Sequence, residues 1–169
     1  MPAHRHALVL GGARSGKSQF AERLALELDA PVVYVATATP SDEEMAERIA
    51  HHRARRPPAW RTLEAGTNLA ARVPAEARTV LVEDLTLLLS NHMEADTSHA
   101  EALTMREVEG LLAVNANVIL VSNEVGMGLV PETPLGRTFR DALGRVNQSA
   151  AALCTEVYFV VAGLPLRMK

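Results

Sequence analysis

The stretch "ALVLGGARSGKS", residues Ala7–Ser18, decides the fold of this chain. Four apolar residues run directly into a glycine-rich turn that closes with Gly-Lys-Ser. The turn fits the pattern G-x-x-x-x-G-K-[ST], with its first glycine at Gly11. Glycines let the backbone wrap its N–H groups around a phosphate, and a following helix adds positive potential. The sequence therefore predicts a strand, a phosphate-binding loop (the P-loop, Gly11–Ser18) and a helix, which together bind a nucleoside triphosphate.

Two side chains of the P-loop have predicted roles. Lys17 is expected to reach the β- and γ-phosphates, and the Ser18 hydroxyl is expected to hold Mg²⁺. A second ligand for the metal should lie at the end of another buried strand. The run "TVLVED" ends in Glu83 and Asp84, which would point to opposite sides of a strand. Only one of these two carboxylates can therefore face the metal.

The rest of the chain predicts an α/β fold. Short runs rich in β-branched residues alternate with longer helical patterns, and their near-continuous hydrophobicity is typical of parallel strands buried on both faces. We expect one domain, residues 1–169, with three layers and ligands at the carboxyl ends of the strands. Besides the first, the predicted strands are Pro31–Thr37, Thr79–Asp84, Asn117–Asn123 and Glu156–Gly163, a weaker one at Trp60–Glu64, and an antiparallel edge at Leu164–Met168.

Three helices can be delimited from the sequence. The first covers Lys17–Leu28. The second begins at a capping box formed by Ser41 and Glu44 and ends near Arg56, before two prolines. The third opens at Thr133 and Pro134, and its predicted buried stripe consists of Leu135, Phe139, Leu143, Val146, Ala150 and Leu153.

Composition excludes several classes of protein. The 169 residues carry a formal net charge of −3, which argues against a general nucleic-acid binder. The single cysteine, Cys154, leaves no intramolecular disulfide and no thiolate zinc cluster. No segment has the length of a signal peptide core or a membrane span, so we expect a cytoplasmic protein without membrane insertion.

The stretch "ERIAHHRARRPPAW", Glu47–Trp60, places His51 and His52 among arginines. Adjacent helical residues point about 100° apart, so the two imidazoles do not suit one metal ion. Nearby cations disfavour the charged imidazolium, and a neutral imidazole is a nucleophile. The pattern suits a histidine that attacks a nucleotide phosphorus. A solvated basic surface with two exposed histidines remains the alternative.

Taken together, several segments resemble the bifunctional adenosylcobinamide kinase/adenosylcobinamide-phosphate guanylyltransferase family of cobalamin synthesis. They span nearly the whole chain, and the long stretch Val121–Gln148 is especially specific. The segments are "GGARSGKS", "YVATA", "DEEMAERIAHHRARRPPAW", "RTLE", "LTLLLSN", "VSNEVGMGLVPETPLGRTFRDALGRVNQ" and "EVYFVVAGLPLRMK".

The resemblance implies a RecA-like P-loop NTPase fold, a homotrimer and two reactions. A nucleoside triphosphate phosphorylates adenosylcobinamide, and GTP then guanylylates the product through a GMP-histidine intermediate, giving adenosylcobinamide-GDP and pyrophosphate. The implied substrates are GTP, ATP and a corrinoid, with Mg²⁺ as cofactor. By position in "RIAHH", the nucleophile carries over to His52, with Lys17 as the second catalytic residue.

The resemblance also carries over a set of nucleotide-contacting residues. By position, Glu83 becomes the favoured metal ligand beside Ser18, with Asp84 as its rival. Asn123 and Glu124 follow a predicted strand; they either touch substrate or metal, or cap a turn. The carried-over nucleotide contacts are Gly11, Gly12, Ala13, Arg14, Ser15, Gly16, Lys17, Ser18, Ala36, Thr37, Ala38, Arg53, Ala54, Arg55, Arg56, Glu64 and Glu83.

Two other functions fit a P-loop sequence. One is a simple kinase for a nucleoside or small alcohol, in which the histidine segment is only a basic lid. The other is a nucleotide-gated binding module, although the chain lacks the guanine-reading motif N-K-x-D. A covalent label from the α-phosphate of GTP would separate both from a guanylyltransferase.

Overall fold

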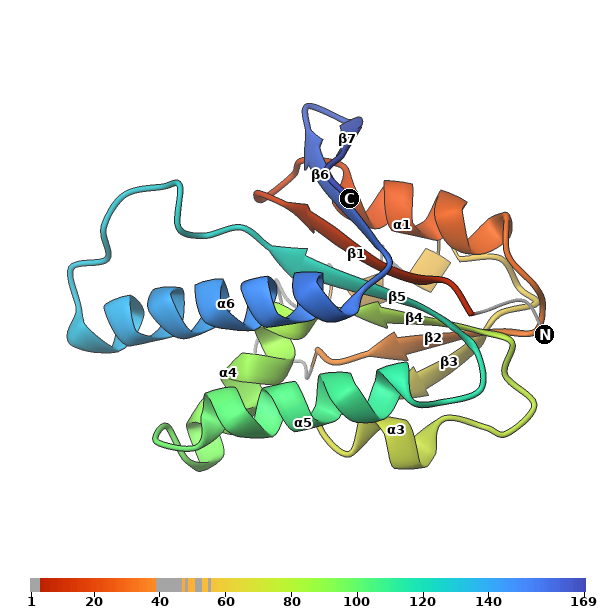
Figure 1. Cartoon of the computed structure of the whole chain (residues 1–169), viewed down its shortest axis with the longest axis horizontal. Coiled ribbons are helices and arrows are strands. Elements are labelled where there is room, and N and C mark those ends of the chain that lie inside the picture. Colours follow the sequence, from red (N-terminus) through yellow and green to blue (C-terminus); the bar gives the residue numbers. More distant parts are fainter. Residues whose placement is uncertain (1–3, 39–46, 48, 51–52, 55) are drawn as a thin grey trace.

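A computed structural model describes residues 4–38, 47, 49–50, 53–54 and 56–169 of the chain. In this part of the chain seven strands form one sheet with the spatial order β3-β2-β4-β5-β1-β6-β7 (Figure 1). Neighbouring strands are parallel, except that β6 and β7 are antiparallel. The strands are β1 (His6–Gly11), β2 (Val32–Ala36), β3 (Arg61–Glu64), β4 (Thr79–Glu83), β5 (Asn117–Asn123), β6 (Glu156–Val161) and β7 (Leu164–Arg167).

Helices cover both faces of the sheet and give the three layers (Figure 1). One face packs on α1 through a core that includes Ala21 and Leu24 of that helix. The other face packs on the remaining helices through a core that includes Leu88, Leu111 and Val146. The helices are α1 (Lys17–Leu26), α3 (Leu69–Arg72), α4 (Leu85–Ala95), α5 (Ala100–Leu112) and α6 (Pro134–Leu153).

The predicted fold class and strands are confirmed. The central strands β1, β2, β4 and β5 are almost wholly buried, which explains their continuous apolar sequences. The weak signal at Trp60–Glu64 is the edge strand β3, and the tail forms the antiparallel edge strand β7. The order of the strands places β5 between β1 and β4, so the P-loop strand and the acidic strand are separated by one strand.

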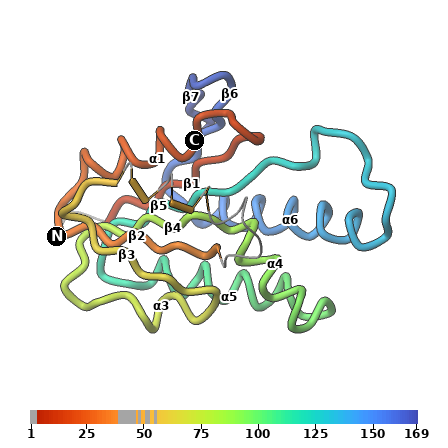
Figure 2. Tube along the Cα trace, turned by 180° about the vertical axis from the view of Figure 1, so that it is seen from behind, coloured from red at the N-terminus to blue at the C-terminus, as the bar shows by residue number. Residues whose placement is uncertain are grey.

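The predicted stripe of the last helix is wrong at its two ends. Leu143, Val146 and Ala150 are fully buried, but Leu135 is 61% exposed and Leu153 is 47% exposed. The long loop after β5 and the first turn of α6, which contains Leu135, extend beyond the sheet, as both views show (Figures 1 and 2), so the periodicity continues there although no core lies beneath it. Leu153 is the last residue of the helix, at its other end. Thr133 caps this helix as expected, accepting a hydrogen bond from the Gly136 N–H at 3.1 Å.

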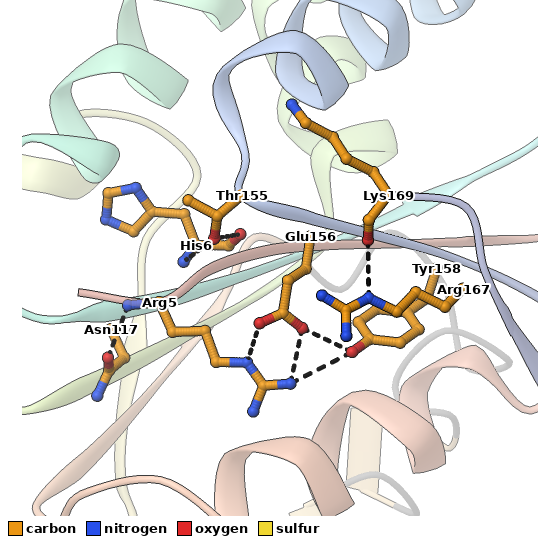
Figure 3. Close-up of polar contacts among 8 residues, drawn as sticks. All are labelled: Arg5, His6, Asn117, Thr155, Glu156, Tyr158, Arg167 and Lys169. Carbon is orange, nitrogen blue, oxygen red and sulfur yellow. Dashed lines mark hydrogen bonds and ion pairs between the residues drawn. The ribbon is translucent and has the colours of Figure 1, made fainter. Parts of the chain in front are cut away.

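A polar cluster fastens the amino end of β1 to β6 (Figure 3). The Arg5 guanidinium donates to both oxygens of Glu156, from Nε at 2.5 Å and from Nη2 at 2.7 Å. The Tyr158 hydroxyl donates to Glu156 Oε2 at 2.6 Å and accepts from Arg5 at 3.2 Å. Arg5 and Tyr158 hold the pKa of the Glu156 carboxyl below its usual value. Arg5 precedes β1, whereas the P-loop follows β1. The polar cluster therefore lies at the end of the strands opposite to the P-loop.

Candidate functional site

The P-loop connects the end of β1 to the start of α1, as the motif predicts. Gly11 ends the strand, and a Cβ there would lie 2.8 Å from the carbonyl oxygen of Val160 on β6. Gly16 has a φ of 91°, a left-handed conformation that favours glycine, and the backbone of Gly163 lies close beside it. Gly11 and Gly16 are therefore needed for the fold itself, because of close packing at Gly11 and the backbone conformation at Gly16, as well as for room to bind a ligand.

The start of α1 presents backbone donors to the loop. Gly16 precedes the helix and has no side chain to cap it, and the Lys17 N–H donates to the Ser15 hydroxyl at 3.4 Å. The loop is held from the other side, because the Gly163 N–H donates to the Ser15 carbonyl at 2.7 Å. The ammonium of Lys17 donates to the Gly12 carbonyl at 3.3 Å, and only 8% of this residue is exposed. This arrangement supplies N–H groups and one cation around a concave turn, which is the chemistry that binds phosphate.

The metal candidates lie at the ends of β4 and α1. The Ser18 hydroxyl donates to Glu83 Oε1, which brings the two predicted ligands into direct contact. The other oxygen, Glu83 Oε2, is buried without a hydrogen-bond partner in the described part of the chain. Burial, together with the nearby Asp84 carboxylate, raises the pKa of Glu83 to about 7. A divalent cation would satisfy this oxygen, so the residues fit a metal site.

Asp84 has a different position. Its Oδ1 accepts from the Leu87 N–H at 2.9 Å and caps the amino end of α4. Its Oδ2 accepts from Asn123 Nδ2 at 3.1 Å. Both oxygens of Asp84 thus have partners within the protein, whereas one oxygen of Glu83 has none among the residues that the structure describes. The geometry favours Glu83 over Asp84 as the ligand beside Ser18.

Asn123 lies at the end of β5, between the P-loop and the acidic strand. Its amide Nδ2 donates to Thr86 Oγ1 at 2.9 Å as well as to Asp84. Its carbonyl accepts from Asn147 of α6 at 3.1 Å. The next residue, Glu124, donates its N–H to the Gly11 carbonyl at 3.0 Å, and its carboxylate accepts from the N–H groups of the following turn. Asn123 therefore connects the end of β5 to the start of α4 and to α6. Glu124 caps the turn that follows it.

The segment after β2 supports the acidic turn. Thr37 is fully buried, and its hydroxyl donates to the Asp84 carbonyl at 2.8 Å and accepts from the Asp84 N–H at 2.7 Å. Asn91 of α4 donates to the Thr37 carbonyl at 3.0 Å. Of the predicted contact segment Ala36–Ala38, the Thr37 side chain and the Thr37 backbone thus bond within the protein, and so does the Ala36 carbonyl, which leaves Ala38 as the candidate ligand contact. Sequence reasoning missed this role because nothing local pairs residue 37 with residue 84.

The structure partly describes the histidine stretch. Arg53 forms an ion pair with Glu64 of β3, so two predicted nucleotide contacts meet each other. Arg56 stacks on the ring of Tyr34, 3.5 Å from its centroid, and Ala54 is exposed. His51, His52, Arg55 and the capping box at Ser41 and Glu44 lie outside the described residues.

Two absences hold for the described ranges. No helix there combines the length and the apolar character that crossing a bilayer requires. No group of three or more His, Cys, Asp and Glu side chains is arranged there to hold a metal ion. Any metal bound beside Ser18 would therefore need ligands from the nucleotide or water as well as from Glu83.

Comparison with solved structures supports the fold. The RadB recombinase crystal structure is similar, with a TM-score of 0.53 and 18% sequence identity, covering 92% of this chain and 73% of that one. At this level of identity the likeness concerns the fold alone. It agrees with the RecA-like architecture that the P-loop resemblance implied.

Comparison with known sequences reaches further. The Pseudomonas aeruginosa bifunctional adenosylcobalamin biosynthesis protein CobP is 48% identical, over 96% of each chain. The CobU proteins of Escherichia coli and Salmonella typhimurium are 42% and 43% identical, over 96% of this chain and 98% of theirs. The family model described as cobinamide kinase / cobinamide phosphate guanyltransferase matches residues 7–168. The chain therefore belongs to the cobinamide kinase / cobinamide phosphate guanyltransferase family.

Proposed function

We propose that this protein phosphorylates adenosylcobinamide with a nucleoside triphosphate and then transfers GMP from GTP to the resulting phosphate. Family membership supports both activities. The observation that carries the proposal is the contact of the P-loop, through Ser18, with Glu83, whose other oxygen is buried and has no hydrogen-bond partner among the described residues. That arrangement binds and neutralises a triphosphate, which both reactions consume.

The first reaction needs positioning and charge neutralisation. An alcohol oxygen of the corrinoid attacks the γ-phosphorus, and the bond to the bridging oxygen breaks to release a nucleoside diphosphate. Backbone N–H groups of the P-loop and of the start of α1 bind phosphate oxygens. Lys17 moves its ammonium from the Gly12 carbonyl to the phosphates, where it offsets charge on the leaving group.

The second reaction attacks a different phosphorus. A ring nitrogen of His52 attacks the α-phosphorus of GTP, and pyrophosphate leaves. A phosphate oxygen of adenosylcobinamide phosphate then attacks the same phosphorus, and the histidine leaves. The covalent step lets GTP and the bulky corrinoid occupy the site in turn. Because arginines flank His52 in the sequence, and nearby cations disfavour the charged imidazolium, we infer that a neutral imidazole is the nucleophile.

Mg²⁺ is the proposed cofactor, with Ser18 and Glu83 as its protein ligands. The donor set of one hydroxyl and one carboxylate, completed by phosphates and water, is one that Mg²⁺ uses in nucleotide sites. When bound, it neutralises charge on phosphate oxygens. The raised pKa of Glu83 agrees with a buried carboxylate whose desolvation Ser18 and Lys17 offset only in part.

The chain is proposed to work as a homotrimer, the assembly that the family resemblance implies. Apolar side chains in the loop after β5 support association: Met127, Leu129 and Val130 are 79%, 95% and 66% exposed. Light scattering on the purified protein tests this, and a monomer at micromolar concentration would contradict it.

The proposed activities are tested by supplying adenosylcobinamide with GTP and MgCl₂. The protein should transfer γ-label from a nucleoside triphosphate to the corrinoid, and should release pyrophosphate only when GTP is present. His52→Ala should keep the first reaction and lose the second, and His51→Ala, changed at the adjacent position, serves as its matched control. Normal pyrophosphate release by His52→Ala would reject the transferase mechanism. Transfer of γ-label alone by the unaltered protein would leave a simple kinase.

A further inference from the structure

One arginine of the histidine stretch is held by the sheet. The guanidinium carbon of Arg56 lies 3.5 Å from the centroid of the Tyr34 ring. Its Nη1 donates to the Thr62 hydroxyl at 3.2 Å. Tyr34 and Thr62 are register partners on β2 and β3, so their side chains form one rung of the sheet. Arg56 therefore rests on a single rigid pair of residues.

The next rung holds a second arginine. Ala36 and Glu64 are register partners two residues further along the strands, the next pair on the same face, and the Glu64 carboxylate pairs with Arg53. The Arg56 N–H donates to the Arg53 carbonyl at 3.3 Å, which links the two anchored residues in one turn. Only the first rung is shielded from water, because Tyr34 is 1% exposed, whereas Arg53 and Glu64 are mostly exposed. The contact at Arg56 should therefore contribute more than the ion pair at Arg53.

The same contacts leave Arg56 poorly placed to bind phosphate. Its Nε is buried and has no hydrogen-bond partner in the described part of the chain, so this end of the guanidinium faces the protein. Its flat face covers the Tyr34 ring. A phosphate-binding arginine normally offers a fork of two N–H groups to the ligand. Here one side of that fork contacts Thr62.

We propose that Arg56 is a positioning residue for guanylyl transfer. Its contacts with Tyr34 and Thr62, called here the Arg56 seat, fix the point at which the chain after the histidines returns to the sheet. The inference rests on the proposed role of His52. Four residues of chain span at most about 14 Å, so a fixed Arg56 sets an upper limit on how far residue 52 can lie from β2. The carboxyl end of β2 adjoins that of β4, where Glu83 contacts Ser18 of the P-loop. The seat thus limits the distance between the histidine and a bound triphosphate.

The test measures the rate at which the whole protein takes up label from GTP labelled at the α-phosphate. Tyr34→Leu removes the aromatic face and keeps an apolar side chain of similar depth. It should slow labelling at saturating GTP by roughly three- to thirtyfold, the factor that corresponds to a cation–π contact. Phosphorylation of adenosylcobinamide should stay at the unaltered rate. Tyr34→Phe keeps the ring and should label at the rate of the unaltered protein.

A matched control and a double variant separate positioning from simple damage to the core. Tyr158 packs in the same core cluster as Tyr34 but contacts Phe20 rather than Arg56. Tyr158→Leu should therefore leave the labelling rate unchanged. Arg56→Met should slow labelling by the same factor as Tyr34→Leu, and the double variant should be no slower than either, because both changes remove one interaction.

The outcomes are distinguishable. If Arg56 binds phosphate instead, Tyr34→Leu will label at the unaltered rate while Arg56→Met is slow, and the inference is overturned. Multiplying factors in the double variant would overturn it too. Should Tyr34→Leu fail to fold, Thr62→Val removes the hydroxyl at constant shape and takes its place. Failure of the proposed function itself looks different, since the unaltered protein would then take up no α-label.

Discussion

Glu83 makes the stability of the metal-free protein depend on pH. Its pKa is raised from an ordinary carboxyl value of 4.5 to about 7, chiefly by burial and by Asp84. The folded state therefore binds this proton more tightly than the unfolded state, and folding loses stability as pH rises from about 4.5 to about 7. A rise of this size corresponds to about 3 kcal/mol above pH 7. Glu83→Gln keeps the shape without the charge, and should recover much of that free energy.

The assay is urea unfolding in EDTA without nucleotide, at pH 5 and at pH 8. Glu83→Gln should be more stable than the unaltered protein by about 1–3 kcal/mol at pH 8 and nearly equal to it at pH 5. Glu76→Gln, at an exposed carboxylate paired only with Arg61, is the control and should show little difference at either pH. Equal effects of Glu83→Gln at both pH values would refute the explanation by desolvation.

Other contacts give further expectations. Arg5→Met should lower the free energy of unfolding by about 1.5–3 kcal/mol at pH 7, because it leaves the Glu156 carboxylate without its charged donor. The Glu156 pKa is lowered in the folded state, so this difference should shrink in acid unfolding as pH falls below about 4; a constant difference would contradict the pairing. Burial raises the pKa of the Cys154 thiol to about 11, so its alkylation at pH 8 should be at least about a hundredfold slower than after unfolding in urea. Gly11→Ala should cost about 1–3 kcal/mol and weaken nucleotide binding, since its Cβ meets the Val160 carbonyl; binding at the unaltered affinity in a fluorescent-nucleotide titration would count against the packing of the loop.

The sequence predicted the structure best where a residue pattern has a single physical cause, as apolar runs and glycines do here. The continuous apolar runs predicted β1, β2, β4, β5 and β6 to within about two residues, because a buried parallel strand has no polar face to interrupt it. The P-loop was read from its glycines, whose positions the backbone requires. The stripe on α6 failed at Leu135, because periodicity does not show how far the sheet extends beneath a helix; it also failed at Leu153, the last residue of that helix.

The polar connections of the site were beyond reach of a single sequence. The choice between Glu83 and Asp84 depends on which one caps α4, and that is a property of three dimensions. The role of Thr37 likewise depends on Glu83 and Asp84, which are distant from it in the sequence. Asn123 was singled out as a candidate because it ends a strand on the ligand side, but its bonds to Asp84 and Thr86 follow from the order of β1, β5 and β4. A single sequence can therefore indicate which polar residues belong to the site, but it does not show which of them hydrogen-bond to each other.

The most direct measurement is a peptide map of the protein after brief incubation with GTP and Mg²⁺, read by mass spectrometry under alkaline conditions that preserve a phosphoramidate. The account predicts one GMP adduct, located on residue 52, that disappears when adenosylcobinamide phosphate is added. An adduct on Lys17 or His51, or a map with no adduct while pyrophosphate is still released, would contradict it.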